Sequence, residues 1–310
     1  MQPALIVNAN AGATRRNPTL PERLRAAAEG RAELFITHDE AELQRTAENL
    51  AAREVQQVGV VGGDGTASTT LTALWRAYGE QRLPDVAFLR GGTMNTVALS
   101  LGISWRPPVQ LLKRALRSWS GHARYVERPA MQVGDRLGFL FGTGMMAGYL
   151  SEYYEQGNGH PTPITAVQVL GKSVLSAITG GGTFARICRT DDLEVHHEGG
   201  VWESRNYITV GAGTVAQVGL GFRPFYRSSE DHRRFHLLAI KGTGMQIARD
   251  LPSVWLGRGM RPETAYETTT PWAELRSSRG PFGYFVDGDL LVAGSRLRLQ
   301  RGPLFRILCI

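Results

Sequence analysis

The chain has 310 residues, enough for two domains or one large one, and with 42% hydrophobic and 20% charged residues it has an ordinary globular composition. Its apolar runs are far shorter than the roughly 20 residues that span a bilayer, its first residues lack the pattern of a signal peptide, and two cysteines cannot build a disulfide framework. The net charge of +7 suits anionic partners such as nucleotide phosphates or acidic lipids, whereas we predict no nucleic-acid binding because no basic run is interleaved with aromatic residues.

Strand and helix patterns alternate over the first 120 residues. Apolar runs that end in Gly, Asn or Thr are each followed by a stretch of helix-forming residues, which is the order expected of a parallel sheet covered on both faces. Thr37 and Glu40 have the spacing of a capping box at the start of the second helix. The predicted strands are 4–8, 32–37, 57–62 and 85–92, and the predicted helices are 17–30, 37–53, 67–78 and 94–103.

The pattern of predicted secondary structure changes near residue 124. Beyond this point most segments read as strands and turns, some with a two-residue alternation of apolar and polar side chains. Helices are predicted at about 145–156, 163–179 and 244–257. We therefore predict an α/β protein of two domains, with a mostly parallel sheet in residues 1–123 and a β-rich, sandwich-like domain in residues 124–294.

The third strand runs directly into Gly62, Gly63, Asp64, Gly65 and Thr66. Glycines let the backbone turn tightly and approach a ligand, and the helix that follows presents unpaired N–H groups and a positive dipole end. A phosphate cradle is one interpretation, although an acid repels phosphate unless a divalent metal lies between them or the carboxylate caps backbone amides. The alternative is a tight strand–helix turn in which Asp64 serves as a cap.

The other predicted strand ends carry the same kinds of residue. The first ends at Asn8, the second at Thr37, and the fourth leads into a segment that contains Thr93 and Asn95. Ligands bind beyond the carboxyl ends of strands in a parallel sheet. Several such ends along one edge predict a single binding site.

Five segments together resemble the diacylglycerol kinase catalytic family, which includes bacterial diacylglycerol kinases, sphingosine kinases and ceramide kinases. They lie in the family's order along nearly the whole chain. The segments are IVNANAG (6–12), VGGDGT (61–66), GGTMNTVALSLGI (91–103), FGTGMMAGYL (141–150) and VDGDLL (286–291).

The resemblance implies a kinase that binds ATP on the first domain and a lipid on the β-rich domain. It also implies that residues from about 295 to 310 return to the first domain. Carried over by position, the residues that would contact the nucleotide are Thr37, Gly62, Gly63, Asp64, Gly65, Thr66 and Thr93, with Asn8 and Asn95 supporting them.

The late segment VDGDLL implies a carboxylate that accepts the proton of the lipid hydroxyl. Asp289 stands in the position of the family's glutamate, and Asp287 is the alternative. From the residues alone, the same segment also reads as a hairpin turn, because Asp-Gly is a strong turn pair. Mg²⁺ would be held by ATP and by Asp64.

The chain departs from the family pattern at positions where relatives carry acids. Thr96 replaces the acid that follows G-T-x-N, and Met145 or Met146 replaces an acid in the second glycine-rich segment. These departures remove two of the acids that the resemblance implies for the metal. The segment 228–238 lacks the glycine and second acid of the family's structural magnesium loop, so we predict no magnesium site there.

The predicted function is transfer of the γ-phosphoryl group of ATP to a hydroxyl of a membrane lipid, either diacylglycerol or a sphingoid lipid such as ceramide or sphingosine. The alternatives are a catalytically weak nucleotide- and lipid-binding pseudokinase and an NAD kinase. The NAD kinase is disfavoured because no Asn-Glu pair follows the first domain. We expect a cytoplasmic protein with peripheral membrane contact, for which the arginine-rich segment 223–236 is either a membrane-facing patch or a solvated loop.

Overall fold

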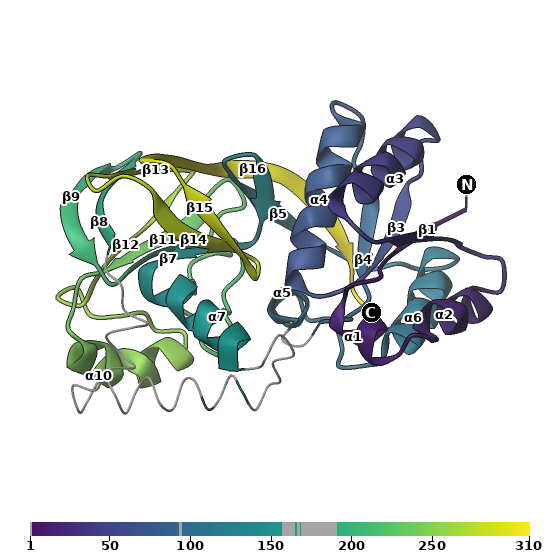
Figure 1. The fold of residues 1–310 in the computed structure, drawn as a ribbon, viewed down its shortest axis with the longest axis horizontal. Helices are drawn as coiled ribbons and strands as arrows, with labels where there is room; N and C mark the ends of the chain where they lie inside the picture. Colours follow the sequence, from purple (N-terminus) through teal and green to yellow (C-terminus); the bar gives the residue numbers. More distant parts are fainter. Residues whose placement is uncertain (1, 93–94, 157–164, 166–167, 169–190) are drawn as a thin grey trace. The chain divides into compact units, whose positions relative to one another are not determined.

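The computed structural model describes residues 2–92, 95–156, 165, 168 and 191–310. The chain folds into two compact units, Met1–Ala130 with Pro303–Ile310 and Met131–Gly302. It passes between the units inside strands β5 (Tyr125–Val133) and β16 (Arg296–Leu308) (Figure 1). Both divisions therefore lie several residues beyond the predicted positions 123 and 295, because a change of composition does not mark the middle of a strand.

The first unit contains a parallel sheet in the order β2-β1-β3-β4-β16, to which β16 contributes its last residues. The order reverses at β1, since β2 lies on one side of it and β3 and β4 lie on the other. In sheets of this kind the crevice beyond the carboxyl ends of such strands is the usual ligand site. The strands are β1 (Ala4–Asn8), β2 (Glu33–Thr37), β3 (Gln57–Val61) and β4 (Asp85–Phe88).

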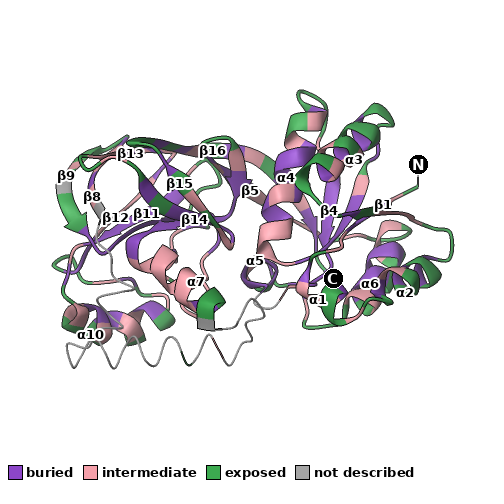
Figure 2. Cartoon of the chain, viewed as in Figure 1, coloured by how far each residue is buried: buried purple, intermediate pink, exposed green. Residues whose placement is uncertain are grey.

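Helices cover both faces of this sheet, with α3 and α4 on one side and α2 and α6 on the other (Figure 1). Helix α3 shows why a helix packs against the sheet with one face. Leu43, Ala47 and Leu50 recur at helical spacing and are buried, while the opposite face is polar. Strands β1, β3 and β4 are almost entirely buried as well, whereas β2 at the edge of the sheet is mostly half-buried (Figure 2). The helices are α1 (Gly12–Arg16), α2 (Leu20–Ala28), α3 (Glu40–Ala52), α4 (Asp64–Tyr78), α5 (Thr96–Ser100) and α6 (Pro108–Trp119).

The predicted cap of α3 is wrong. Asp39, rather than Thr37, occupies the N-cap position, and its carboxylate accepts the N–H of Glu42 at 2.7 Å. Thr37 is still paired with Asn8 in the sheet, so its backbone belongs to β2 and not to the helix start. Asp39 has the extended conformation that a capping residue needs.

The second unit is a sandwich of antiparallel strands, as predicted. One sheet has the order β12-β11-β10-β7-β14-β15, and the other runs β16-β13-β8-β9 with β5 and β6 beside it. Side chains from both sheets, among them Phe141, Val195, Phe235 and Leu299, form one buried core. The strands are β6 (Arg136–Gly138), β7 (Leu140–Thr143), β8 (Asp191–His197), β9 (Gly200–Tyr207), β10 (Thr209–Gly213), β11 (Phe235–Ile240), β12 (Ala265–Thr270), β13 (Trp272–Ser277), β14 (Phe282–Val286) and β15 (Asp289–Ala293).

Two helices of this unit lie where the sequence predicts them. Helix α7 (Gly144–Gln156) packs on β7, β10 and β14, and α10 (Gly244–Trp255) begins with a capping box formed by Thr243 and Gln246. The predicted helix at 163–179 lies outside the described residues.

The turns that follow β3 and β4 touch backbone to backbone. The N–H of Gly91 donates to the carbonyl of Gly62 at 2.7 Å. A Cβ on Gly92 would lie 2.4 Å from the Cα of Gly63, and a Cβ on Gly91 would lie 3.0 Å from the backbone nitrogen of Gly62. Only glycine permits this approach, because the neighbouring atoms are backbone and cannot move aside like a flexible side chain.

We predict that Gly92→Ala lowers the free energy of unfolding by about 1–3 kcal/mol, since the new methyl group forces the two turns apart. Urea denaturation measures the change. Gly283→Ala is the matched control, because a Cβ there meets no atom within 4 Å. An equal loss of stability in both variants would contradict the close-packing explanation.

Candidate active site

The carboxyl ends of β1 and β3 are joined by a side-chain hydrogen bond. The amide nitrogen Nδ2 of Asn8 donates to Oγ1 of Thr66 at 2.8 Å, and Oδ1 of Asn8 accepts the N–H of Asn10 at the same distance. Gly62 leaves the room that Thr66 occupies, because a Cβ on Gly62 would lie 2.3 Å from the Cβ of Thr66. Two of the predicted site residues are thus brought together at the point where the strand order reverses.

The glycine-rich turn ends at the first residues of α4. Gly63 is the N-cap, and Asp64, Gly65 and Thr66 form the first turn of the helix. The N–H of Ala67 bonds to the carbonyl of Gly63 at 2.9 Å, which starts the helical ladder. N–H groups of a first turn have no partner within their own helix, and with the helix dipole they favour an anion. The glycine backbone and the start of a 15-residue helix fit a phosphate group.

Asp64 caps a neighbouring helix rather than its own. Its Oδ2 accepts the N–H of Thr96 at 2.8 Å, and its Oδ1 accepts the N–H of Val97 at 3.0 Å. Burial raises the pKa of Asp64 to about 6, against the opposing effect of these two hydrogen bonds and of the nearby Arg90 charge. Of the options that the sequence left open, capping of backbone amides is the one observed.

The other residues predicted to contact or support the nucleotide lie in different local structures. Asn95 is the N-cap of α5 with a left-handed backbone at φ 50°, and its side chain bonds both the N–H and the carbonyl of Gly92. Thr37 is buried at the end of β2, where its carbonyl accepts the N–H of Ala9 at 2.9 Å. Thr93 lies outside the described residues.

The donor set near these strand ends fits a metal carried by a nucleotide better than a metal bound by protein alone. No group of three or more His, Cys, Asp or Glu side chains able to hold a metal occurs in the described part of the chain. Thr96, which has no acidic side chain, contributes a backbone N–H to Asp64. Asp64 is therefore the carboxylate that Mg²⁺ would find beside the cradle.

The late segment forms a two-residue hairpin turn between β14 and β15. Asp287 and Gly288 have φ values of 47° and 105°, and Val286 pairs with Asp289 across the turn. Positive φ at both central residues is typical of type I′ turns. Asp287 is 2% exposed, and its carboxylate oxygens accept the N–H groups of Phe139 and Leu140, both at 2.8 Å. Asp287 thus ties the hairpin to the start of β7.

Asp289 has a different setting from Asp287. It is the first residue of β15, its side chain is 37% exposed, and its Oδ2 lies 3.5 Å from Nη1 of Arg136. Tyr154 of α7 donates its hydroxyl to the carbonyl of Gly288 at 3.1 Å, so the helix that follows the second glycine-rich segment contacts this turn. Of the two candidate acids, Asp289 is the more exposed.

The sequence reasoning missed Arg90, which lies two residues beyond the end of β4. Arg90 is 7% exposed, and its Cζ lies 3.8 Å from the centre of the exposed Trp105 ring. The sequence feature that could have pointed to Arg90 is its position immediately before the Gly91–Gly92 turn. A lone arginine after a strand, however, predicts neither burial nor stacking.

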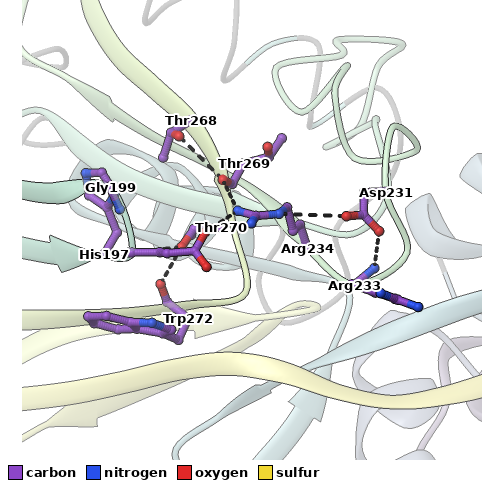
Figure 3. Close-up of polar contacts among 10 residues, drawn as sticks. His197, Gly199, Asp231, Arg233, Arg234, Thr268, Thr269, Thr270 and Trp272 are labelled. Atoms are coloured by element: carbon purple, nitrogen blue, oxygen red, sulfur yellow. Dashed lines mark hydrogen bonds and ion pairs between the residues drawn. The ribbon is translucent and has the colours of Figure 1, made fainter.

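Two arginines of the segment 223–236, Arg227 and Arg234, form ion pairs with acidic side chains. Nε of Arg227 lies 3.0 Å from Oε1 of Glu230, and Arg234 pairs with Asp231 at 3.7 Å and with Glu198 at 2.5 Å. Figure 3 shows Arg234 between Asp231 and the carbonyl of Thr269, to which it donates at 3.2 Å. These contacts describe an ordered surface loop. The membrane-facing role of this segment stays a prediction, and no helix in the described ranges is long and apolar enough to cross a membrane.

Comparison with known proteins extends the family resemblance. A sequence model of the diacylglycerol kinase catalytic domain matches residues 2–127. A protein of Yersinia enterocolitica named "Probable lipid kinase YegS-like" is 25% identical over 275 residues, which cover 86% of this chain and 83% of that protein.

Solved structures show the same fold. A diacylglycerol kinase from Bacillus anthracis str. Sterne aligns with a TM-score of 0.65 and 17% identity, over 100% of this chain and 97% of that one. Two further structures from the same organism give TM-scores of 0.71 and 0.69 at 18% and 17% identity, with the same coverage. The predicted two-domain α/β fold is confirmed. Its motifs, its fold and the match of residues 2–127 to the model of the diacylglycerol kinase catalytic domain identify the chain as a kinase whose first domain is similar to that family.

Proposed function

We propose that this protein is an ATP-dependent lipid kinase that transfers the γ-phosphoryl group to a hydroxyl of diacylglycerol or of a sphingoid lipid such as ceramide or sphingosine. The observation that carries the proposal is the glycine backbone beside the start of α4, at the strand-order reversal of a catalytic domain of this family. The Yersinia relative, whose name describes a lipid kinase, resembles the chain over most of its length.

The nucleotide phosphates would bind the N–H groups of the first turn of α4, from Asp64 to Thr66. Gly62 and Gly63 let the phosphates approach the backbone, and Asn8 orients Thr66. Asn95 would act indirectly by fixing Gly92, while Thr37 and Thr93 would contact the rest of the nucleotide. Mg²⁺ would be carried by ATP and would use Asp64 as a protein ligand, supplying neutralisation of phosphate charge.

The lipid hydroxyl would give its proton to Asp289 as its oxygen attacks the γ-phosphorus in line. The exposure of Asp289 supports this role, and the nearby Arg136 guanidinium would hold the carboxylate in place. Asp287 is disfavoured as the base because it is only 2% exposed, which keeps a lipid hydroxyl away from its carboxylate. We expect the enzyme to act peripherally at the cytoplasmic surface of a membrane.

A catalytically weak nucleotide- and lipid-binding protein is the second candidate. It is favoured by Thr96, Met145 and Met146, which stand where relatives carry acids. Transfer of label from γ-radiolabelled ATP to diacylglycerol, ceramide, sphingosine and NAD distinguishes the candidates. We expect a labelled lipid. Nucleotide binding without any labelled product would support the second candidate, and labelled NAD would contradict the proposal.

We predict that Asp289→Asn reduces turnover by at least about 10²-fold, the usual contribution of a general base, while ATP affinity and stability stay unchanged. Asp287→Asn should instead lower the free energy of unfolding by about 1–3 kcal/mol, because an amide offers one oxygen to two buried N–H groups. Steady-state kinetics, nucleotide titration and urea denaturation measure these effects. Full activity in Asp289→Asn would reject this residue as the base.

We also predict a pH dependence in the use of Mg²⁺. Because the pKa of Asp64 is raised to about 6, its carboxyl group becomes neutral as the pH falls below that value and can no longer bind a metal. The gain in ATP affinity that Mg²⁺ provides should therefore shrink between pH 7 and pH 5. Calorimetric titration at both pH values, with and without Mg²⁺, measures this gain.

Asp64→Asn is the control for this experiment, since an amide does not titrate in this range. Its Mg²⁺-dependent gain in ATP affinity should be smaller and should change less between the two pH values than that of the wild type, because only the terminal phosphate of ATP, with a pKa of about 6, then titrates. A wild-type gain that stays constant from pH 7 to pH 5 would contradict a role for Asp64 at the metal.

A further inference from the structure

Arg90 carries a buried charge without a hydrogen-bonded partner in the described structure. The residue is 7% exposed, and both Nη1 and Nη2 are buried with no hydrogen bond. One face of the guanidinium lies on the indole of Trp105, with Cζ 3.8 Å from the ring centre. Such stacking orients the guanidinium plane but accepts none of its N–H groups.

An arrangement of this kind is costly unless an anion completes it. Arginine stays charged at any ordinary pH, and a buried charge without partners costs several kcal/mol in general. Asp64 attracts Arg90 electrostatically, yet its two oxygens accept the N–H groups of Thr96 and Val97. The terminal nitrogens of the guanidinium therefore still lack an acceptor.

The backbone places Arg90 beside the phosphate cradle. The N–H of Leu89 donates to the carbonyl of Val60 at 2.8 Å, and the N–H of Gly91 donates to the carbonyl of Gly62 at 2.7 Å. The carbonyl of Gly91 accepts the N–H of Ala13 at 2.8 Å. Arg90 is thus fixed from both sides, next to the turn that leads into α4.

We propose that Arg90 is a phosphate-binding residue, whose guanidinium binds oxygens of the polyphosphate of the nucleotide. This inference rests on the proposed nucleotide function and adds a residue to it. A planar guanidinium presents paired donors that match two phosphate oxygens, and its charge does not depend on a metal. Trp105, at 68% exposed, stacks on one face of the guanidinium and leaves the N–H groups at its edge available to phosphate oxygens.

The charges of the same segment support this assignment. Thr96 is neutral at a position where relatives carry an acid, and the described residues contain no cluster of acids and histidines able to hold a metal. A cationic side chain would then neutralise part of the phosphate charge. Arg90 lies six residues before Thr96 and supplies that charge.

The test is calorimetric titration of Arg90→Gln with ADP in the presence of EDTA, beside titration with adenosine. Loss of a charge-assisted contact should weaken ADP binding about 10- to 100-fold. Adenosine affinity should not change, because adenosine has no phosphate. Arg106→Gln is the matched control, since it removes the same charge from an exposed position next to Trp105 and should leave ADP affinity unchanged.

Thermal denaturation of the ligand-free protein separates binding from a structural role. The substitution breaks no hydrogen bond of the terminal nitrogens and removes only the charge attraction to Asp64, so the ligand-free Arg90→Gln should melt close to the temperature of the wild type. Arg90→Lys, which keeps the charge but loses the paired donors, should have an intermediate ADP affinity. A lower melting temperature with unchanged ADP affinity would overturn the proposal in favour of a structural role.

The outcomes also separate this inference from the function on which it rests. Wild-type protein that binds neither ADP nor ATP, with or without Mg²⁺, would contradict the nucleotide function itself. Wild-type protein that binds ADP with the same affinity as Arg90→Gln would overturn only the assignment of Arg90. Equal weakening in Arg106→Gln would show a general charge effect and would likewise overturn that assignment.

Discussion

The site depends on one steric constraint, the backbone contact between the turns that follow β3 and β4. Gly63 and Gly92 approach so closely that a Cβ on Gly92 would lie 2.4 Å from the neighbouring Cα. This contact brings the start of α4 and the start of α5 together, which lets Asp64 reach the N–H groups of Thr96 and Val97. Small residues here are therefore required by the fold as well as by any ligand that approaches the backbone.

Hydrogen bonding to backbone N–H groups distinguishes the roles of the acids. Asp64 and Asp287 each accept two backbone N–H groups and so connect segments that are distant in sequence. Asp289 instead forms an ion pair with the side chain of Arg136 and stays partly exposed. The same residue type can thus hold a turn in place or stay partly exposed, and the backbone contacts decide which.

Local patterns predicted much of this structure, and long-range contacts account for what they missed. The alternation of strands and helices indicated the parallel sheet, and Asp-Gly indicated the hairpin at Asp287, because both depend on neighbouring residues. The partners of Asp64 are more than 30 residues away, so sequence pattern could not choose between a metal and amide capping. Arg90 was missed because its stacking on Trp105 joins two residues that are distant in sequence, and Thr37 was misassigned because strand β2 continues through it.

The most direct test of the central claim is a crystal structure of the protein with a non-hydrolysable ATP analogue and Mg²⁺. The account predicts phosphate oxygens within hydrogen-bonding distance of the backbone nitrogens of residues 64–66, with Gly62 and Gly63 against the phosphates. An analogue bound elsewhere, with the first turn of α4 facing solvent or the adenine base, would contradict it.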